Sequence, residues 1–424
     1  MQKYEELVCD LVIPPLAEVE QVFETECLAD TAETLREHLQ RPEIKATIKS
    51  GMSIAITCGS RSPIDIVPIT KTVVDFVKEQ GAKAFIFPAM GSHGGATDEG
   101  QKEMLASLGI TEESMGCPIR SSMQTVHLAD LEDGRPVYID KYASEADGII
   151  VINRVKAHTS FTADYESGLI KMCAIGLGKQ YGAEIAHANG LLAMGPEVEA
   201  FGVKVLTDAK ILFGVGFVEN AFHRTYDIRA MLPDEILKEE PAMLKKAKEL
   251  SARIAFEYLD VLVIDEIGKD IAGPGFDPHV LHLYVVGHPK NNEGRRAKRI
   301  VALDLTHASH GCAMGGGTVD LITKRFVDKV DRNATYCNSL TNKYLEPSKL
   351  APYFDTDKLS IQAALKTLLK LDYETLRMVR IKNTLDLKRI WISPALLEEA
   401  RTMQNIKIIS EPKPLPFDEK GNLF

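Results

Sequence analysis

The chain has 424 residues, of which 45% are hydrophobic and 26% are charged, and its formal net charge at pH 7 is −10. This length exceeds what one hydrophobic core usually holds, so we expect two or three domains. The acidic balance argues against a nucleic acid or an anionic membrane as the main partner, although a small anionic substrate needs only a few local cations.

The expected location is the cytoplasm. No apolar run approaches the roughly 20 residues needed to cross a bilayer, and the acidic N-terminal stretch lacks the apolar core of a secretory signal. Seven cysteines, an odd number, are spread along the chain without a Cys-x-x-Cys pair. This usage is typical of reduced thiols rather than of a disulfide framework or a zinc site.

Short β-branched runs alternate with helical patterns along the chain. Such alternation predicts parallel sheets with right-handed crossovers. We therefore expect an α/β protein with two α/β domains, mainly parallel sheets and an active-site cleft between the domains. The predicted strands are residues 52–57, 84–88, 148–152, 211–218, 261–264 and 301–305, and the predicted helices are residues 66–79, 97–108, 168–178 and 233–258.

Residues 268–278 contain three glycines and two prolines between a predicted strand and a new block of strands. Such a segment is typical of a linker or a functional loop. We therefore predict an N-terminal domain of residues 1–270 and a C-terminal domain of residues 275–408. The tail, residues 410–424, is rich in proline and charge and is expected on the surface, where it can return to the first domain.

Three strand-to-loop junctions carry the candidate functional residues, because open α/β sheets bind ligands beyond the carboxyl ends of their strands. The first junction follows strand 52–57 and contains Arg61. A guanidinium there can clamp a carboxylate or a phosphate with two hydrogen bonds. A solvent-facing arginine in a tight turn is the alternative interpretation.

The second junction, residues 91–100, reads Gly-Ser-His-Gly-Gly-Ala-Thr-Asp-Glu-Gly. Gly94 and Gly95 permit a close approach of the backbone, and Thr97 is a good N-cap for the helix that follows. Free N–H groups at such a helix start can hold a phosphate, and His93 would lie at the mouth of the site as a proton-transfer group. A simple strand-to-helix turn with an incidental histidine fits the same residues.

The third junction, residues 153–179, is the richest in polar groups. Lys171 is flanked by apolar residues, and a lysine there is costly to bury as an ammonium, which favours the nucleophilic amine. The alternative is a lysine that extends from an amphipathic helix into solvent. His187 follows 16 residues later in a stretch of small residues. Lys179 is a rival nucleophile, but its neighbouring glycines predict a helix end, where a cation is simply stabilising.

Taken in chain order, these residues resemble the nickel-pincer lactate racemase family. The resemblance covers most of the chain and is strongest over residues 50–190, with the spacing from the lysine to the last histidine kept. The residues that carry it are Arg61 in an Arg-x-Pro turn, His93 in Gly-Ser-His, His158, Ser167 and Gly168 shortly before Lys171, and His187.

The resemblance implies a cofactor made from nicotinic acid, a pyridinium-3-thioamide-5-thiocarboxylate mononucleotide that carries nickel. One sulfur-bearing arm would join Lys171 through a thioamide, and His187 would hold the nickel together with two sulfurs and a ring carbon. Soft sulfur with imidazole suits a late first-row metal. Enzymes that build and load the cofactor are then expected partners. The other expected cofactor-binding residues are Ser167, Gly168, Gly94, Gly95 and Thr97.

The same resemblance implies a racemase or epimerase, an isomerase that inverts the C2 hydroxyl carbon of a 2-hydroxy acid. The C2 hydrogen would leave reversibly as hydride to the cofactor while a base takes the hydroxyl proton, which gives a planar 2-keto acid. His93 and His158 are the expected pair of bases, and Arg61 is expected to hold the substrate carboxylate. The N-terminal domain would bind the cofactor, and the C-terminal domain would close over the substrate.

Departures from the lactate racemase pattern predict a substrate other than lactate. The arginine turn begins with Cys58 in place of an aspartate, and Gly94-Gly95 stands where the family has Arg-Pro. The family's second-domain lysine, which helps to bind lactate, has no clear counterpart. The candidates for that role are Lys269, Lys324 and Arg325.

Two other functions stay open from the sequence. A Schiff-base or pyridoxal-type enzyme could use Lys171, but it would need a phosphate cup and a partner for the ring nitrogen, and we identify neither. A non-catalytic two-domain protein could bind an acidic metabolite without turning it over. The histidine pairs at 279 and 282 and at 307 and 310 lack further ligands at zinc spacing, so we interpret them as loop histidines.

Overall fold

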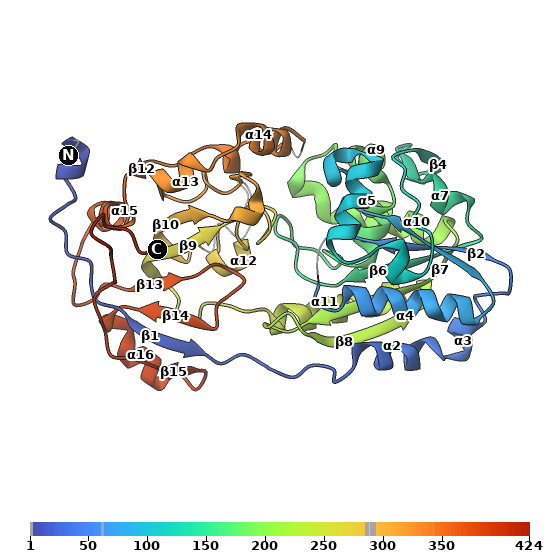
Figure 1. Cartoon of the computed structure of the whole chain (residues 1–424), viewed down its shortest axis with the longest axis horizontal. Helices are drawn as coiled ribbons and strands as arrows, with labels where there is room; N and C mark the ends of the chain where they lie inside the picture. The colour runs from blue at the N-terminus through green and yellow to red at the C-terminus, as the bar shows by residue number, and fades with distance from the viewer. Residues whose placement is uncertain (1–2, 61–62, 285–287, 289–293, 342) are drawn as a thin grey trace. The chain divides into compact units, whose positions relative to one another are not determined.

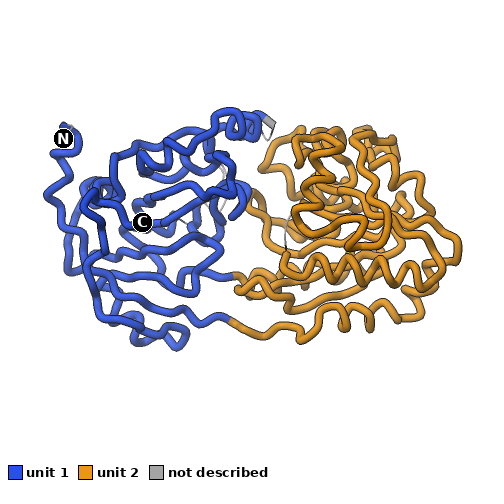
Figure 2. The backbone as a smooth tube through the Cα atoms, viewed as in Figure 1, with its two compact units in different colours: residues 1–23, 252–424 blue, residues 24–251 orange. Residues whose placement is uncertain are grey.

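A computed structural model describes residues 3–60, 63–284, 288, 294–341 and 343–424. The chain forms two compact units (Figure 2). One unit comprises residues 24–251, and the other comprises residues 1–23 together with residues 252–424. Each unit has its own sheet and its own hydrophobic core.

The main sheet of the 24–251 unit has five strands in the order β3-β2-β6-β7-β8, of which β2, β6, β7 and β8 are labelled in Figure 1. Its first four strands are parallel neighbours, and β8 is antiparallel to β7. A separate hairpin of β4 and β5 accompanies the sheet. The strands are β2 (Ser53–Cys58), β3 (Lys83–Pro88), β4 (Thr125–Asp130), β5 (Pro136–Asp140), β6 (Gly148–Arg154), β7 (Ile211–Glu219) and β8 (Thr225–Met231).

Helices cover both faces of this sheet, because successive residues of a strand point to opposite faces. Ala55 and Ile149 belong to the core that packs against α8, α10 and α11, whereas Ile54 and Ile150 belong to the core under α2, α4 and α5. The helices are α2 (Thr31–Leu39), α3 (Pro42–Lys45), α4 (Ile66–Glu79), α5 (Asp98–Ser107), α6 (Glu112–Met115), α7 (Lys141–Glu145), α8 (Leu169–Lys171), α9 (Lys179–Ala186), α10 (Met194–Asp208) and α11 (Pro233–Leu250).

The sheet of the other unit has eight strands in the order β12-β11-β10-β9-β13-β14-β1-β15. The strands from β12 to β13 are parallel, and the remaining neighbours are antiparallel. Mainly parallel pairing in both units confirms the predicted α/β class. The strands are β1 (Ala17–Gln21), β9 (Leu259–Ile267), β10 (Ala297–Leu305), β11 (Leu321–Thr323), β12 (Tyr353–Phe354), β13 (Met378–Ile381), β14 (Arg389–Ile392) and β15 (Ile406–Ile408).

The helices of this unit are short and flank the sheet. The longest described ones are α14 and α15, with ten residues each. The helices are α1 (Lys3–Glu6), α12 (Pro278–Leu281), α13 (Lys324–Asp328), α14 (Arg332–Thr341), α15 (Asp357–Lys366) and α16 (Leu397–Thr402).

The compact units divide the chain differently from the domains expected at residues 1–270 and 275–408. The N-terminal strand β1 pairs with β14 and β15, so the first 23 residues join the unit of the C-terminal residues. Strand β9 lies in the middle of the same sheet, so residues 252–267 also belong to the unit of the C-terminal residues. The tail also belongs to this unit, where the N–H of Leu423 donates to the carboxylate of Asp357 at 2.8 Å.

Two predicted helices have different extents in the structure. The helix expected over residues 168–178 is a short α8 that continues as a π-helical turn, η2 (Met172–Gly176), in which the N–H of Leu177 donates to the carbonyl of Met172. The helix expected over residues 233–258 ends at Leu250. Ser251, the C-cap, is extended, and the following Ile254 and Phe256 are buried in the core of the other unit.

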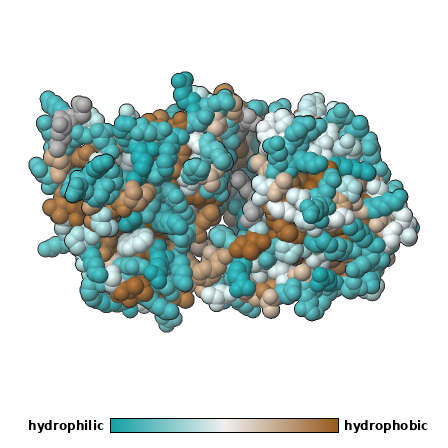
Figure 3. Space-filling model, viewed as in Figure 1, coloured by the Kyte–Doolittle hydropathy of each residue, from teal (hydrophilic) through white to brown (hydrophobic). Residues whose placement is uncertain are grey.

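The surface is mainly hydrophilic on the face shown in Figure 3, with apolar residues scattered over both units. Within the described ranges, the helices are all too short or too polar to cross a membrane.

Candidate functional site

The loops after β2, β3 and β6 leave the main sheet of the 24–251 unit at one edge, because the carboxyl ends of parallel strands meet there. The helical run α8–η2–α9 packs on these loops, so the three predicted junctions contact one segment. A Cβ built on Gly59 would lie 3.2 Å from the Cε of Met172, a Cβ built on Gly91 would lie 3.8 Å from the Cβ of Ala183, and the Nδ2 of Asn153 donates to the carbonyl of Gly168 at 2.7 Å.

Arg61, the predicted carboxylate clamp, lies outside the described residues. Its loop begins at Gly59, against Met172, and Met172 directly follows Lys171 in the chain. The start of the arginine loop and the lysine segment are therefore neighbours in space.

His93 is an exposed residue in the loop between β3 and α5. Its Nδ1 lies 2.7 Å from the carbonyl oxygen of Met90, to which its backbone N–H also donates at 3.2 Å. A carbonyl oxygen only accepts, so Nδ1 carries the proton and Nε2 is the basic nitrogen of the neutral ring. An exposed imidazole with this tautomer suits the removal of a proton from a substrate.

The glycines after His93 have different surroundings. Gly94 and Gly95 have φ angles of 64° and 65°, in the left-handed region that favours glycine. A Cβ on Gly94 would lie 2.6 Å from backbone atoms of Gly100 and Gln101, whereas a Cβ on Gly95 would meet nothing within 4 Å. Gly94 is thus required by the packing of the loop on α5, and Gly95 leaves the backbone open.

Thr97 is the N-cap of α5, as predicted, and its Oγ1 accepts from the N–H of Gly100 at 3.1 Å. The first turn of this helix also contains Asp98 and Glu99. Negative side chains there make the helix start less favourable for an anion. Phosphate binding by Gly94, Gly95 and Thr97 stays a prediction, and these two acids weigh against it.

His158 is half-buried in the loop after β6, and its ring stacks on Phe161 with the centroids 4.2 Å apart. The backbone N–H of His158 donates to Oε2 of Glu166 at 2.7 Å. Glu166 is buried, and its Oε1 accepts from Nζ of Lys248 at 2.7 Å. A buried carboxylate therefore holds the loop from within and fixes the path of the backbone at His158.

The ring nitrogen Nδ1 of His158 accepts from the N–H of Ser160 at 3.1 Å. An accepting Nδ1 puts the ring proton of a neutral imidazole on Nε2. His158 and His93 therefore have opposite tautomers.

Lys171 is the last residue of α8 and is half-buried, with its Nζ 3.5 Å from Oγ of Ser167. Ser167 is itself tied by two backbone hydrogen bonds to Lys156, of 2.7 and 3.1 Å. The neighbours Ile170 and Met172 are buried in the core. The amine of Lys171 thus lies between an apolar core and the polar loop after β6.

Glu240, on α11, is a residue that sequence reasoning missed. Its Oε2 accepts from the N–H groups of Leu169 and Ile170, at 2.9 and 3.1 Å. These are the first N–H groups of α8, which have no partner within the helix. A Cβ on Gly168 would overlap Oε1 of the same carboxyl group. Gly168 is therefore the residue type that lets Glu240 cap the helix that carries Lys171.

Burial raises the pKa of Glu240 to about 7, and the two N–H donors offset part of this effect. The sequence did contain a signal for this residue. Glu240 lies four residues after Ile236 and three before Met243, which places a carboxyl group on the apolar face of the predicted helix.

Lys179 differs from its prediction, because it starts helix α9 instead of ending one and is fully buried. Its Nζ donates to the carbonyl of Pro88 at 2.8 Å and to Oε1 of Gln101 at 2.5 Å, and it lies 3.7 Å from Oδ2 of Asp140. An amine enclosed in this way has no room for a tethered ligand, which favours Lys171 as the attachment point.

His187 is the C-cap of α9 and is half-buried. Its Nδ1 lies 2.6 Å from the carbonyl oxygen of Ala183, so Nδ1 carries the ring proton and Nε2 is the nitrogen of the type that binds metals. Over the part of the chain that the structure describes, no three His, Cys, Asp or Glu side chains are grouped to hold a metal ion.

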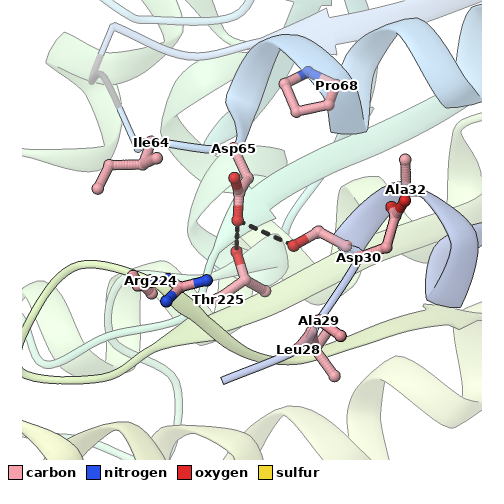
Figure 4. A pocket seen from close by; sticks show the side chains of 10 residues that line it. Leu28, Ala29, Asp30, Ala32, Ile64, Asp65, Pro68, Arg224 and Thr225 are labelled. Carbon is pink, nitrogen blue, oxygen red and sulfur yellow. Dashed lines mark hydrogen bonds between the residues drawn. The ribbon is translucent and has the colours of Figure 1, made fainter. Parts of the chain in front are cut away.

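A pocket of about 240 Å³ in the same unit contains none of the predicted site residues (Figure 4). It lies where the starts of α2, α4 and β8 meet. Oδ2 of Asp65 accepts from Oγ1 of Thr31 at 2.9 Å and from Oγ1 of Thr225 at 2.5 Å. The carboxylate of Asp65 is thus occupied by two threonine hydroxyls. The pocket is a gap where α2, α4 and β8 pack together, and Asp65 links these three elements.

In the other unit, the three candidate cations have different partners. Lys324 is exposed and pairs with Asp328 at 2.6 Å. Arg325 pairs with Asp357 at 2.9 Å and Asp304 at 3.2 Å. These carboxylates argue against a substrate-binding role for Lys324 and Arg325. Lys269 follows β9, and its Nζ donates to the carbonyl of Gly273 at 3.1 Å and to Oδ1 of Asn338 at 3.0 Å.

The histidine pairs of this unit have structural contacts. Nε2 of His282 lies 2.9 Å from a guanidinium nitrogen of Arg296, and Nδ1 of His279 lies 3.3 Å from the hydroxyl of Tyr284. The rings of His307 and His310 are 6.4 Å apart. These contacts agree with their interpretation as loop histidines.

Comparison with known proteins gives one family match. Residues 11–195 match the family model of the lactate racemase N-terminal domain. Among solved structures, the lactate racemase apoprotein from Thermoanaerobacterium thermosaccharolyticum is 12% identical with a TM-score of 0.49, and the match covers 80% of this chain and 88% of that one. A Thermotoga maritima protein is 14% identical with a TM-score of 0.46, covering 64% and 70%. No curated protein matches the chain.

The matched range, residues 11–195, contains every predicted site residue from Arg61 to His187. Over this range the chain is similar to the N-terminal domain of the lactate racemase family. The similarity supports a racemase-like enzyme, on the α/β fold that the structure shows.

Proposed function

We propose that this protein inverts the C2 hydroxyl carbon of a 2-hydroxy acid with a nickel-pincer nucleotide tethered to Lys171. The observation that carries the proposal is the run α8–η2–α9. It holds Lys171 near its start and His187 at its end, and it packs on the loops of all three predicted junctions.

The residues present fit this cofactor. The hydrogen bond from Nδ1 of His187 to the carbonyl oxygen of Ala183 keeps the ring proton on Nδ1. Nε2 is therefore the nitrogen that can bind nickel. His187 would be the protein ligand of the nickel, and the cofactor itself would supply the other donors. Lys171 is partly exposed, whereas Lys179 is enclosed. These features support His187 as the metal ligand and Lys171 as the tether.

When bound, the nickel-pincer nucleotide supplies an acceptor for the C2 hydrogen as hydride. The chain must then take the hydroxyl proton, and His93 is suited to this step because its Nε2 is basic. Loss of a hydride and a proton turns a 2-hydroxy acid into a planar 2-keto acid. Return of the hydride to the opposite face of C2, with a proton to the carbonyl oxygen, gives the other configuration.

His158 and Arg61 complete the proposed site. With its proton on Nε2, His158 donates a hydrogen bond to a substrate oxygen. Service as a second base requires that it release Ser160 or turn its ring. Arg61 binds the substrate carboxylate with two hydrogen bonds. Gly94 and Gly95 stand where lactate racemase has Arg-Pro, which favours a substrate other than lactate.

The first test is cofactor attachment. The chain is expressed with the enzymes that build and load the nickel-pincer nucleotide, which are its partners in this proposal, and intact mass and nickel content are measured. We expect a covalent adduct with bound nickel that is absent from Lys171→Ala. A matched control is Lys204→Ala, because Lys204 is a half-buried lysine of α10 paired with Asp208 at 2.7 Å.

The proposal fails if the adduct persists in Lys171→Ala. It also fails if no adduct forms while a lactate racemase loaded in parallel acquires one. The loaded protein is then incubated with single enantiomers of a panel of 2-hydroxy acids in deuterated water. Inversion with the C2 hydrogen retained supports hydride transfer, whereas deuterium at C2 in the product contradicts it.

A further inference from the structure

Lys179 occupies a costly position for a lysine. Its side chain is fully buried, and its backbone φ is 54°, in the left-handed region that side chains with a Cβ rarely adopt. A buried ammonium needs hydrogen-bond and charge partners. Both costs persist only where the surrounding structure requires them. The partners of Nζ therefore indicate what this lysine holds.

Gln101 connects Lys179 to the His93 loop. Its Oε1 accepts from Nζ of Lys179 at 2.5 Å, and its Nε2 donates to the carbonyls of Gly91 at 2.9 Å and of His93 at 3.1 Å. The orientation of the amide is settled, because its nitrogen faces two acceptors and its oxygen faces a donor. Nζ of Lys179 also donates to Pro88, the last residue of β3.

A carboxylate balances the buried charge. Asp140 ends β5, is fully buried and lies 3.7 Å from Nζ of Lys179. Its Oδ1 accepts from the N–H of Ala143 at 3.0 Å. Burial raises the pKa of Asp140 to about 6, and Lys179 counteracts part of that rise. The lysine is thus anchored on one side by Asp140 and on the other by Gln101.

We propose that Lys179 and Gln101 are positioning residues for His93. Together they fix the loop of residues 88–93 at both ends, so that the ring of His93 stays bonded to Met90 and presents Nε2 to the substrate. Neither residue touches the substrate. The inference rests on the proposed function only in naming His93 as the base.

A purely structural role for this pair would lower stability without changing the imidazole of His93. The test therefore reads the tautomer of His93 directly, from the ring nitrogen resonances of the full-length, cofactor-free protein labelled with 15N-histidine. Spectra of His93→Gln and His187→Gln assign the two signals.

Three variants are compared. Gln101→Glu keeps an oxygen for Lys179 but removes both N–H donors to the loop, and Lys179→Met removes the amine. The control is Lys102→Met, next to Gln101 on α5, whose exposed ammonium lies 3.6 Å from Glu112.

In the parent protein and in Lys102→Met, we expect His93 to keep its proton on Nδ1. In Gln101→Glu and Lys179→Met, the His93 signals shift to those of a mixture of tautomers, while in Gln101→Glu His187 keeps its own signal through Ala183. In loaded enzyme, kcat falls about tenfold to a hundredfold with little change in KM.

Unchanged His93 signals in folded Gln101→Glu overturn the inference, whatever the fate of Lys179→Met. The spectra need no cofactor. Failure of the nickel-pincer proposal would therefore leave this result intact, and the reverse also holds.

Discussion

The backbone N–H of Ser160 donates to Nδ1 of His158 over 3.1 Å, whereas Nδ1 of His93 donates to the carbonyl of Met90 over 2.7 Å. The two histidines of the proposed site therefore present different groups at Nε2. In the neutral ring, Nε2 of His93 carries a lone pair, whereas Nε2 of His158 carries the proton. A pair of equivalent bases would have matching tautomers.

This difference predicts unequal effects of the same substitution. His93→Gln removes a base, and we expect kcat for C2 inversion to fall about 10²- to 10⁴-fold. In His158→Gln the amide nitrogen can replace the N–H donor, so we expect a loss of about tenfold, the usual scale for one hydrogen bond. Equal losses in the two variants would indicate that both histidines act as bases.

A substitution at Gly168 distinguishes two reasons for this glycine, which are packing against Glu240 and contact with the cofactor. A Cβ at this position would overlap Oε1 of Glu240, so Gly168→Ala should lower the free energy of unfolding of the cofactor-free protein by about 2 kcal/mol. The matched control is Gly182→Ala, because a Cβ there would lie 3.4 Å from the carbonyl of Tyr138. Urea denaturation measures both. A fully stable Gly168→Ala protein would leave cofactor contact as the only reason for this glycine.

Glu240 predicts a pH dependence of stability. Burial raises its pKa from 4.5 to about 7 in the folded protein. Between these values the folded state binds more protons than the unfolded state, so stability falls as pH rises. The contribution is complete below about pH 4.5 and is lost above pH 7. Its size is about 3 kcal/mol, since one pKa unit corresponds to about 1.4 kcal/mol.

Glu240→Gln keeps the side chain uncharged at every pH, so its melting temperature should fall less than that of the parent protein between pH 4.5 and pH 7. The control is Glu239→Gln, because Glu239 is the adjacent residue and forms a surface ion pair with Arg229 at 2.8 Å. Parallel pH profiles for the parent protein and Glu240→Gln would show that Glu240 does not titrate in this range.

Much of the 24–251 unit follows from local patterns. The helix expected over residues 66–79 matches α4 (Ile66–Glu79), and the strands expected at 148–152 and 211–218 are β6 and β7 with ends moved by one or two residues. Strands buried on both faces read as continuous apolar runs, which a single sequence reveals. Strand β1 reads Ala-Glu-Val-Glu-Gln, a short alternation of apolar and polar residues, and its partners lie more than 360 residues away. A local pattern therefore cannot assign this strand to the sheet of the C-terminal residues.

The residues of the candidate site also fall into two groups, those that the sequence indicates and those that only the structure reveals. His93, His158, Lys171 and His187 stand in an order that a sequence displays, and the structure attaches their loops to one helical run. Glu240 and Gln101 act on backbone N–H and carbonyl groups, and such contacts leave no spacing rule in the sequence. The glycines around Lys179 predicted a helix end at this residue. Whether a helix begins or ends there depends on the burial of the Lys179 amine against β3 and β5.

The second unit provides a prediction that is independent of the cofactor. Arg325 lies 2.9 Å from the fully buried carboxylate of Asp357, its guanidinium stacks 4.3 Å from the ring of Phe424, and it donates to the Phe424 carbonyl. Burial already raises the pKa of Asp357. Arg325→Met would leave that carboxylate without its counter-charge, so we expect the free energy of unfolding to drop by about 3 kcal/mol at neutral pH.

Lys324→Met is the matched control, because the neighbouring Lys324 forms an exposed pair with Asp328 that contributes little to stability. The single tryptophan, Trp391, lies in β14 of the same unit, so urea denaturation followed by its fluorescence reports on this unit. If Arg325→Met unfolded at the same urea concentration as Lys324→Met, Asp357 would have to be neutral in the folded protein. In that case its carboxyl group would lose nothing when the guanidinium is removed, and the C-terminal residues would be held by packing alone.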